Sequence, residues 1–118
     1  MDYREYKYLS KKYKIKIINC RTVRDKNKVA LSSRNFLLSK YNLHTAGLVA
    51  KYLINLKPSI KKNNILSQIK NELENKYSIS VEYLELRDLH DLKTTKFKKK
   101  YRLFIAYYIN NIRIIDNF

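Results

Sequence analysis

The chain has 118 residues, 45% of them hydrophobic, which is enough to form the core of one compact domain but not of two. The single Cys excludes an internal disulfide and a cysteine-based zinc cluster. Neither a signal peptide nor a run of about 18 apolar residues that could span a membrane is present, so we expect a cytoplasmic protein.

The first third of the chain is predicted to form a helix, a strand and a loop. Residues 2–12 are polar with interspersed apolar side chains, a pattern typical of a short amphipathic helix. Residues 14–18 read Lys-Ile-Lys-Ile-Ile and predict a strand that ends at Cys20, which we expect to be a small buried side chain. The charged stretch 21–28 has no periodicity and is predicted to be a loop.

Two helices are predicted in the middle of the chain. Ser39 is a plausible N-cap, and the residues after it repeat apolar side chains at helical spacing. Lys57-Pro58-Ser59 is expected to end this first helix. The apolar stripes of the two helices are predicted core positions: Leu43, Ala46, Val49, Ala50, Leu53 and Leu56 in the first, and Ile65, Leu66, Ile69 and Leu73 in the second.

The last third is predicted to form strands. Residues 79–86 alternate and indicate a half-buried strand, residues 94–100 a charged connection, and the continuously apolar 103–109 a central strand. Asn110-Asn111 is a two-residue turn that accepts positive φ and leads into a strand over 112–115. The predicted fold class is α+β, with a small, mostly antiparallel sheet packed against two helices.

The segment most informative about chemistry is Leu31-Ser32-Ser33-Arg34-Asn35. Two hydroxyls followed by a guanidinium, in a loop ahead of a helix, can hold phosphate oxygens, because the hydroxyls and loop N–H groups donate and Arg offers a planar charged fork. On these residues alone, an ordinary polar turn is the competing explanation. The glycines and the Lys-Ser/Thr ending of a P-loop are missing.

Other polar residues indicate structure rather than chemistry. The carboxylates Glu82, Glu85, Asp88 and Asp91 could suggest acid–base work, but a solvated strand end with local ion pairs explains them more simply. His44 and His90 are far apart in sequence and lack further ligands, so no metal site is predicted. Asp116-Asn117 would by itself be a polar tail.

Four blocks in chain order carry a family resemblance. Each block resembles a segment of the pantothenate synthetases. The blocks are residues 20–25 (Cys-Arg-Thr-Val-Arg-Asp), residues 29–39 with Leu31-Ser32-Ser33-Arg34-Asn35 and Leu38-Ser39, residues 81–88 (Val-Glu-Tyr-Leu-Glu-Leu-Arg-Asp) and residues 113–117 (Arg-Ile-Ile-Asp-Asn). Each block is weak alone, but together they cover nearly the whole chain from Ile15 onward. The resemblance therefore favours the phosphate-contact explanation over a polar turn.

The resemblance implies a pantoate–β-alanine ligase, an adenylate-forming enzyme of coenzyme A biosynthesis. Its substrates are pantoate, β-alanine and ATP with Mg, and the family forms homodimers. An N-terminal Rossmann-like domain binds the substrates and a smaller C-terminal domain closes over it as a lid. The lid's Ser-Ser-Arg loop, which touches the ATP phosphates, corresponds to Ser32, Ser33 and Arg34, with Arg34 as the catalytic residue. Val23 and Leu31 match positions that contact the nucleotide through backbone groups.

Departures from the family pattern limit what the chain is expected to do. The family's His-x-Gly-His motif, its pantoate-binding glutamines and its Mg ligation have no counterpart. Residues 1–118 are therefore expected to be a single lid domain without the nucleotide-binding domain, inactive alone. Lys28 stands where the family usually has glycine, which strains a positive-φ turn there.

Two alternatives remain. The formal net charge of +16 and the eleven tyrosines could serve a small nucleic-acid-binding domain. However, the basic residues are scattered in short runs, and A/T-rich codons would enrich Lys, Asn, Ile and Tyr together, so we favour compositional bias. The other alternative is a non-catalytic remnant of a split gene.

Overall fold

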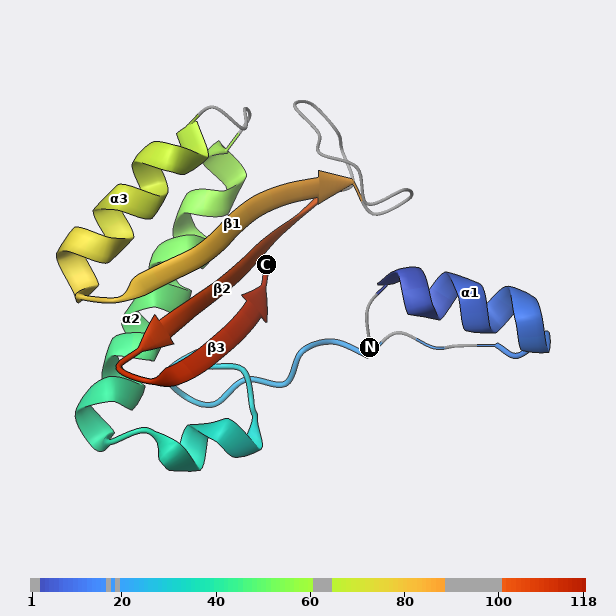
Figure 1. The fold of residues 1–118 in the computed structure, drawn as a ribbon, viewed down its shortest axis with the longest axis horizontal. Helices are drawn as coiled ribbons and strands as arrows, with labels where there is room; N and C mark the ends of the chain where they lie inside the picture. The colour runs from blue at the N-terminus through green and yellow to red at the C-terminus, as the bar shows by residue number, and fades with distance from the viewer. Residues whose placement is uncertain (1–2, 17, 19, 61–64, 89–100) are drawn as a thin grey trace.

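The computed structural model describes residues 3–16, 18, 20–60, 65–88 and 101–118. The helices in these ranges are α1 (Tyr3–Tyr13), α2 (Lys40–Leu56) and α3 (Leu66–Tyr77), with short 3-10 helices η1 (Ser33–Leu37) and η2 (Lys57–Ser59). The strands are β1 (Ser80–Asp88), β2 (Tyr101–Ile109) and β3 (Ile112–Asn117). The expected α+β class, with an antiparallel sheet packed against two helices, is confirmed (Figure 1).

The sheet has the order β1-β2-β3, so β2 is central, as its continuous apolar run predicts. Both pairings are antiparallel, and β2 and β3 are joined by Asn110 and Asn111. Asn110 has φ 53°, which Asn tolerates better than most residues. A bulge between Val81 and Tyr83 shifts the register of β1. Because of this bulge, Leu84 and Leu86 face the same core as Val81.

The core lies between one face of the sheet and the helices α2 and α3. Ser39 caps α2 as expected, since its Oγ accepts a hydrogen bond from the Asn42 N–H at 3.1 Å. The stripes predicted for the two helices supply buried side chains that join those of the strands. The largest fully buried side chains are Val49, Leu53, Ile60, Leu73, Leu86, Leu103 and Ile105.

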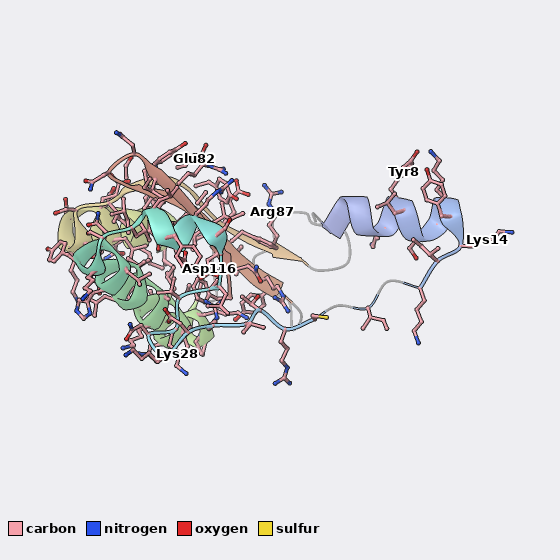
Figure 2. All side chains as sticks on the ribbon, turned by 90° about the horizontal axis from the view of Figure 1, so that it is seen from below. Tyr8, Lys14, Lys28, Glu82, Arg87 and Asp116 are labelled. Atoms are coloured by element: carbon pink, nitrogen blue, oxygen red, sulfur yellow. The ribbon has the colours of Figure 1, made fainter. Side chains whose placement is uncertain are left out.

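The N-terminal segment lies apart from this core. Helix α1 confirms the predicted helix, and Figure 2 shows it, with Tyr8 and the adjacent Lys14, at one end of the molecule. The predicted strand at 14–18 is wrong for its described residues: Ile15 and Ile18 are exposed, Ile18 by 73%, and Lys14 has φ 50°. The described part of the chain offers this segment no neighbouring strand, and a lone extended segment has only water to satisfy its backbone groups.

Cys20 is exposed, so its expected burial is also wrong. Without a strand there, nothing carries its side chain into the core. The predicted connection 94–100, Asp91 and His90 lie outside the described residues, as does the side chain of Asp88. No helix in the described ranges is both long and apolar enough to cross a membrane.

Candidate functional site

The segment between α1 and α2 contains a tight turn that presents the Ser-Ser-Arg sequence. Leu31 N donates to the carbonyl oxygen of Val23 at 2.9 Å, and Arg24 and Ala30 form an antiparallel bridge. The Asp25 carboxylate closes the tip by accepting hydrogen bonds from the N–H groups of Asn27 (2.8 Å) and Val29 (3.0 Å). We call residues 23–31 the hairpin. Its internal bonds bring the backbones of Val23 and Leu31 side by side.

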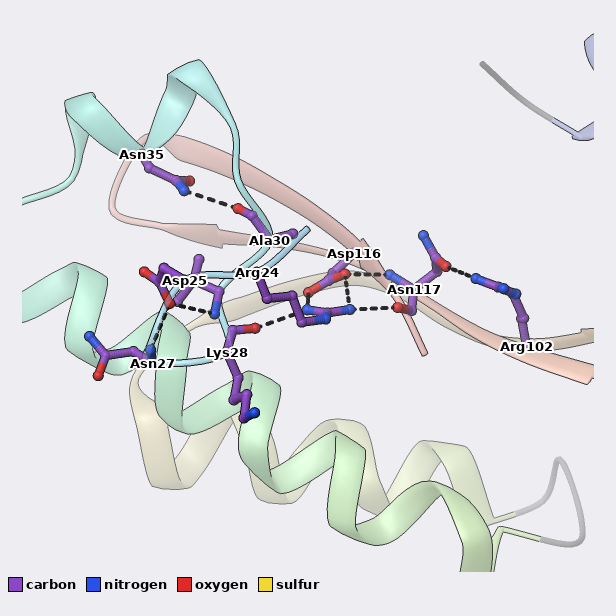
Figure 3. Close-up of polar contacts among 10 residues, drawn as sticks. Arg24, Asp25, Asn27, Lys28, Ala30, Asn35, Arg102, Asp116 and Asn117 are labelled. Carbon is purple, nitrogen blue, oxygen red and sulfur yellow. Dashed lines mark hydrogen bonds and ion pairs between the residues drawn. The ribbon is translucent and has the colours of Figure 1, made fainter. Parts of the chain in front are cut away.

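Arg24 ties the hairpin to the C-terminal end of β3. Its Nη1 lies 2.8 Å from Asp116 Oδ2 and its Nη2 lies 2.9 Å from Asp116 Oδ1, a bidentate pair (Figure 3). The same guanidinium donates to the carbonyl oxygens of Lys28 and Asn117, each at 2.9 Å. It also lies 4.7 Å from the centroid of the Phe118 ring. We call this set of contacts, from Arg24 to Asp116 and to the Asn117 carbonyl, the latch.

Helix α2 supports the hairpin from another side. A Cβ atom added at Gly47 would lie 3.0 Å from the Asn27 carbonyl oxygen and 3.1 Å from Asn27 Cβ. Any larger residue at this position would therefore require the hairpin or the helix to shift by a few tenths of an ångström. Val29, which is 4% exposed, anchors the hairpin in the core beside the same helix.

Ser32, Ser33 and Arg34 directly follow the hairpin, and their side chains are exposed. Ser32 Oγ accepts a hydrogen bond from Arg34 N at 3.2 Å and so caps η1. Asn35 Nδ2 donates to the Ala30 carbonyl oxygen at 3.0 Å, which fixes the start of η1 against the hairpin. Within the described ranges, the Arg34 guanidinium has neither an ion pair nor a hydrogen bond. Backbone and side-chain hydrogen bonds thus hold the start of η1, where three consecutive exposed residues carry two hydroxyls and a guanidinium.

A cavity of about 220 Å³ lies between this segment, α2 and β3. Ser32, Arg34 and Asn35 line it on one side, and Arg113 and Asp116 on another. Tyr107 also lines it, and burial, with a smaller effect from the negative charge of Asp116, raises the pKa of Tyr107 well above its usual range. The folded chain therefore favours the neutral form of this phenol.

The other polar residues considered from the sequence form no second site. Glu82 pairs with Arg113 and Glu85 with Arg87, as the ion-pair explanation predicts. His44 is exposed in α2. Over the described residues, no three His, Cys, Asp or Glu side chains come together as a metal cluster would require.

Sequence reasoning missed the latch. Val23, Leu31, Ser32, Ser33 and Arg34 do lie together, as their nearness in sequence suggests, with Val23 66% and Leu31 61% exposed. The sequence gives Arg24 no separate role, and Asp116, 92 residues away, would by itself be part of a polar tail. The only signal was that both residues fall within blocks that resemble one family.

Comparison with known proteins decides the family. The family model for pantoate-beta-alanine ligase matches residues 8–118. The chain belongs to this family. Pantothenate synthetase from Flavobacterium psychrophilum is 35% identical over 112 residues, which cover 90% of the chain and 40% of the relative. The chain thus spans about two fifths of the length of this family member.

Solved structures of the family have the same fold. Pantothenate synthetase from Thermus thermophilus superimposes with a TM-score of 0.74 at 19% identity, over 95% of the chain and 43% of that structure. The pantoate-beta-alanine ligase from Francisella tularensis, complexed with beta-gamma ATP and beta-alanine, superimposes with a TM-score of 0.64 at 28% identity. That match covers 96% of the chain and 37% of that structure.

Proposed function

We propose that the chain supplies the ATP-phosphate contact of a pantoate–β-alanine ligase. The observation that carries this proposal is the exposed Arg34, whose guanidinium makes no ion pair or hydrogen bond within the described residues and which lines one cavity with Ser32. A preorganised cation stabilises negative charge that develops on transferring phosphate oxygens, and the hydroxyls orient those oxygens. The Francisella relative's complex with a form of ATP supports this assignment.

In this proposal the reaction joins pantoate to ATP, releases pyrophosphate, and then lets the amine of β-alanine displace AMP. Arg34 acts in the first step, where charge builds on the bridging and leaving oxygens. The backbones of Val23 and Leu31 contact the nucleotide. As a lid, the domain also excludes water, which protects the acyl adenylate from hydrolysis.

The described residues account for only part of such a site. The Ser-Ser-Arg segment offers hydrogen-bond donors and a cation, which suit phosphate oxygens and not Mg²⁺. We therefore assign Mg²⁺, adenine and pantoate mainly to a separate nucleotide-binding domain of the kind that longer relatives contain. It follows that the 118-residue chain alone makes no pantothenate, and that the catalytic unit contains this further domain, within a homodimer.

A reconstitution experiment tests the proposal. The chain is combined with the part of the Flavobacterium relative that it does not span, and pantothenate formation is measured. We expect activity only in the mixture, and Arg34→Ala should lower kcat by about 100-fold, the usual effect of removing one charge-stabilising donor. Arg21→Ala is the matched control, because Arg21 is an exposed arginine of the same segment.

The outcomes separate the parts of the proposal. Full activity with Arg34→Ala would overturn the role of the segment. Turnover by the chain alone would overturn its dependence on another domain. Nucleic-acid binding and a non-catalytic remnant stay as alternative predictions, and the second requires a reconstituted mixture without activity.

A further inference from the structure

The latch connects two parts of the molecule that share no other side-chain ion pair among the described residues. Its side chains are largely buried: Arg24 is 18% exposed and Asp116 is 8% exposed. Arg24 makes four hydrogen bonds, two to the Asp116 carboxylate and one each to the carbonyls of Lys28 and Asn117. The planar fork of arginine matches this arrangement, and a lysine could satisfy only part of it.

The two ends of the latch differ in what holds them. Asp116 belongs to β3 and pairs with Ile105 of the central strand, and two residues further on Phe118 exchanges two backbone hydrogen bonds of 2.9 Å with Leu103. The C-terminal end is therefore part of the sheet. The hairpin is instead held together by its own bonds, from Asp25 to Asn27 and to Val29. Val29 and α2 hold one side of the hairpin in the core, and the latch is the side-chain contact that ties it to the end of β3.

The hairpin leads directly into the Ser-Ser-Arg segment (Ser32, Ser33 and Arg34). The backbone N–H of Leu31, the last hairpin residue, donates a hydrogen bond to the carbonyl oxygen of Val23, and Ser32 is next in the chain. The Asn35 side chain donates a hydrogen bond to the carbonyl oxygen of Ala30 in the hairpin. A rotation of the hairpin would therefore carry Ser32, Ser33 and Arg34 with it.

We propose that Arg24 and Asp116 are positioning residues, which set the place of Arg34 relative to the sheet without touching the nucleotide themselves. This inference rests on the proposed function of the Ser-Ser-Arg segment. Without the latch, the hairpin keeps its internal bonds and its buried Val29, so the domain stays folded while the segment moves. Misplacement of a contact group by about 1 Å is enough to weaken its effect strongly.

The test uses the 118-residue chain labelled with ¹⁵N, combined with the part of the Flavobacterium relative that it does not span, and titrated with ATP. Asp116→Asn keeps the shape of the side chain and removes its charge, and Arg24→Lys keeps the charge and removes the fork. We expect either change to weaken the ATP-induced shifts of the Ser32–Asn35 amides by about tenfold in apparent affinity, and to lower the order parameters of residues 29–34. Glu82→Gln is the matched control, since it neutralises the carboxylate of another ion pair on the sheet.

A double-mutant cycle separates positioning from stability. If the latch acts through Arg34, Asp116→Asn should have no further effect on ATP affinity in an Arg34→Ala background, while its effect on thermal unfolding stays the same. Equal loss of affinity in both backgrounds, or an unchanged affinity in Asp116→Asn, would overturn the inference.

The failure of the proposed function has a different signature. If the native chain, in the reconstituted mixture, shows no ATP-induced shifts at residues 32–35, the phosphate contact itself is wrong. The order parameters then still report on the latch: values for residues 29–34 that stay as high in Asp116→Asn as in Glu82→Gln would show that the latch does not hold the segment, and the inference would fail separately.

Discussion

At the scale of single residues, Lys28 stands in a backbone conformation that suits glycine. Its φ is 73°, and its carbonyl oxygen accepts a hydrogen bond from Arg24 Nη1. A side chain in the left-handed region costs about 1–2 kcal/mol. We expect Lys28→Gly to raise the free energy of unfolding by up to about 1 kcal/mol, because the relief of strain exceeds the extra entropy of glycine in the unfolded chain. Urea denaturation measures it.

Lys28→Ala is the control for this prediction. It removes the charge but keeps the Cβ atom, so it should not stabilise the chain. If alanine and glycine stabilise equally, the relevant effect is the loss of a positive charge and not of backbone strain.

Lys28 and Asp116 show which properties of a single residue can be predicted from the sequence and which cannot. The strain at Lys28 was predictable, because a long side chain replaces the glycine usual in the family, and φ confirms it. The role of Asp116 was not predictable, since its partner Arg24 is 92 residues away and no local pattern joins them. The predicted burial of Cys20 is wrong for the same reason, because it required a strand at 14–18, and that strand would need a partner strand from a distant part of the sequence.

At the scale of secondary structure, a polar contact joins the two core helices. Tyr52 of α2 donates a hydrogen bond of 2.6 Å to Glu72 of α3. Burial, and then this hydrogen bond, raise the pKa of Tyr52 to about 12. We expect Tyr52→Phe to lower the free energy of unfolding at pH 7 by about 1 kcal/mol. Tyr41→Phe, at a site 77% exposed, is the control and should have little effect.

The same bond predicts a pH dependence. Tyr52 holds its proton more tightly in the folded chain than in the unfolded chain, where its pKa is close to 10. Its contribution is therefore complete below about pH 10 and is lost as the pH rises toward 12. The stability difference between the native chain and Tyr52→Phe should shrink over this interval in urea titrations. A difference that stays constant from pH 8 to pH 11.5 would contradict the assignment.

Elements whose own residues specify them were predictable, and elements that need a partner were not. Helices α2 and α3 repeat apolar residues along one face, and Ser39 and Pro58 mark the limits of the first. Residues 103–109 of strand β2 form a continuous apolar run, which is typical of a central strand. The stretch 14–18 has the alternating pattern of a strand, but a strand is stable only beside another strand, and the described residues provide none for it. The bulge in β1 also left no sequence signal, because it appears only in the register with β2.

At the scale of the whole molecule, the formal net charge of +16 acts on every state of the chain. The ion pairs among the described residues are few, and most of them lie at the surface. Repulsion among the scattered cations therefore outweighs these pairs and is stronger in the compact state. The same charge predicts weak, sequence-independent binding to DNA that falls steeply with salt, whether or not binding is a function.

Salt should therefore stabilise the fold. Raising NaCl from 20 to 200 mM shortens the screening length to below about 10 Å, which weakens the repulsion between distant surface charges more than the buried contact of Arg24 with Asp116. We expect the melting temperature, followed by circular dichroism, to rise by a few degrees, since about 1 kcal/mol corresponds to roughly 4 °C or more in a domain of this size.

A pair of charge variants checks the cause. Lys26 and Lys51 are exposed, and changing both to Glu lowers the net charge by two at each site, from +16 to +12. This variant should melt higher than the native chain at 20 mM NaCl and respond less to added salt. Changing both to Arg keeps the charge and should leave the response unchanged. A melting temperature that falls with salt would mean that the ion pairs, and the latch above all, stabilise the fold more than the surplus of positive charge destabilises it.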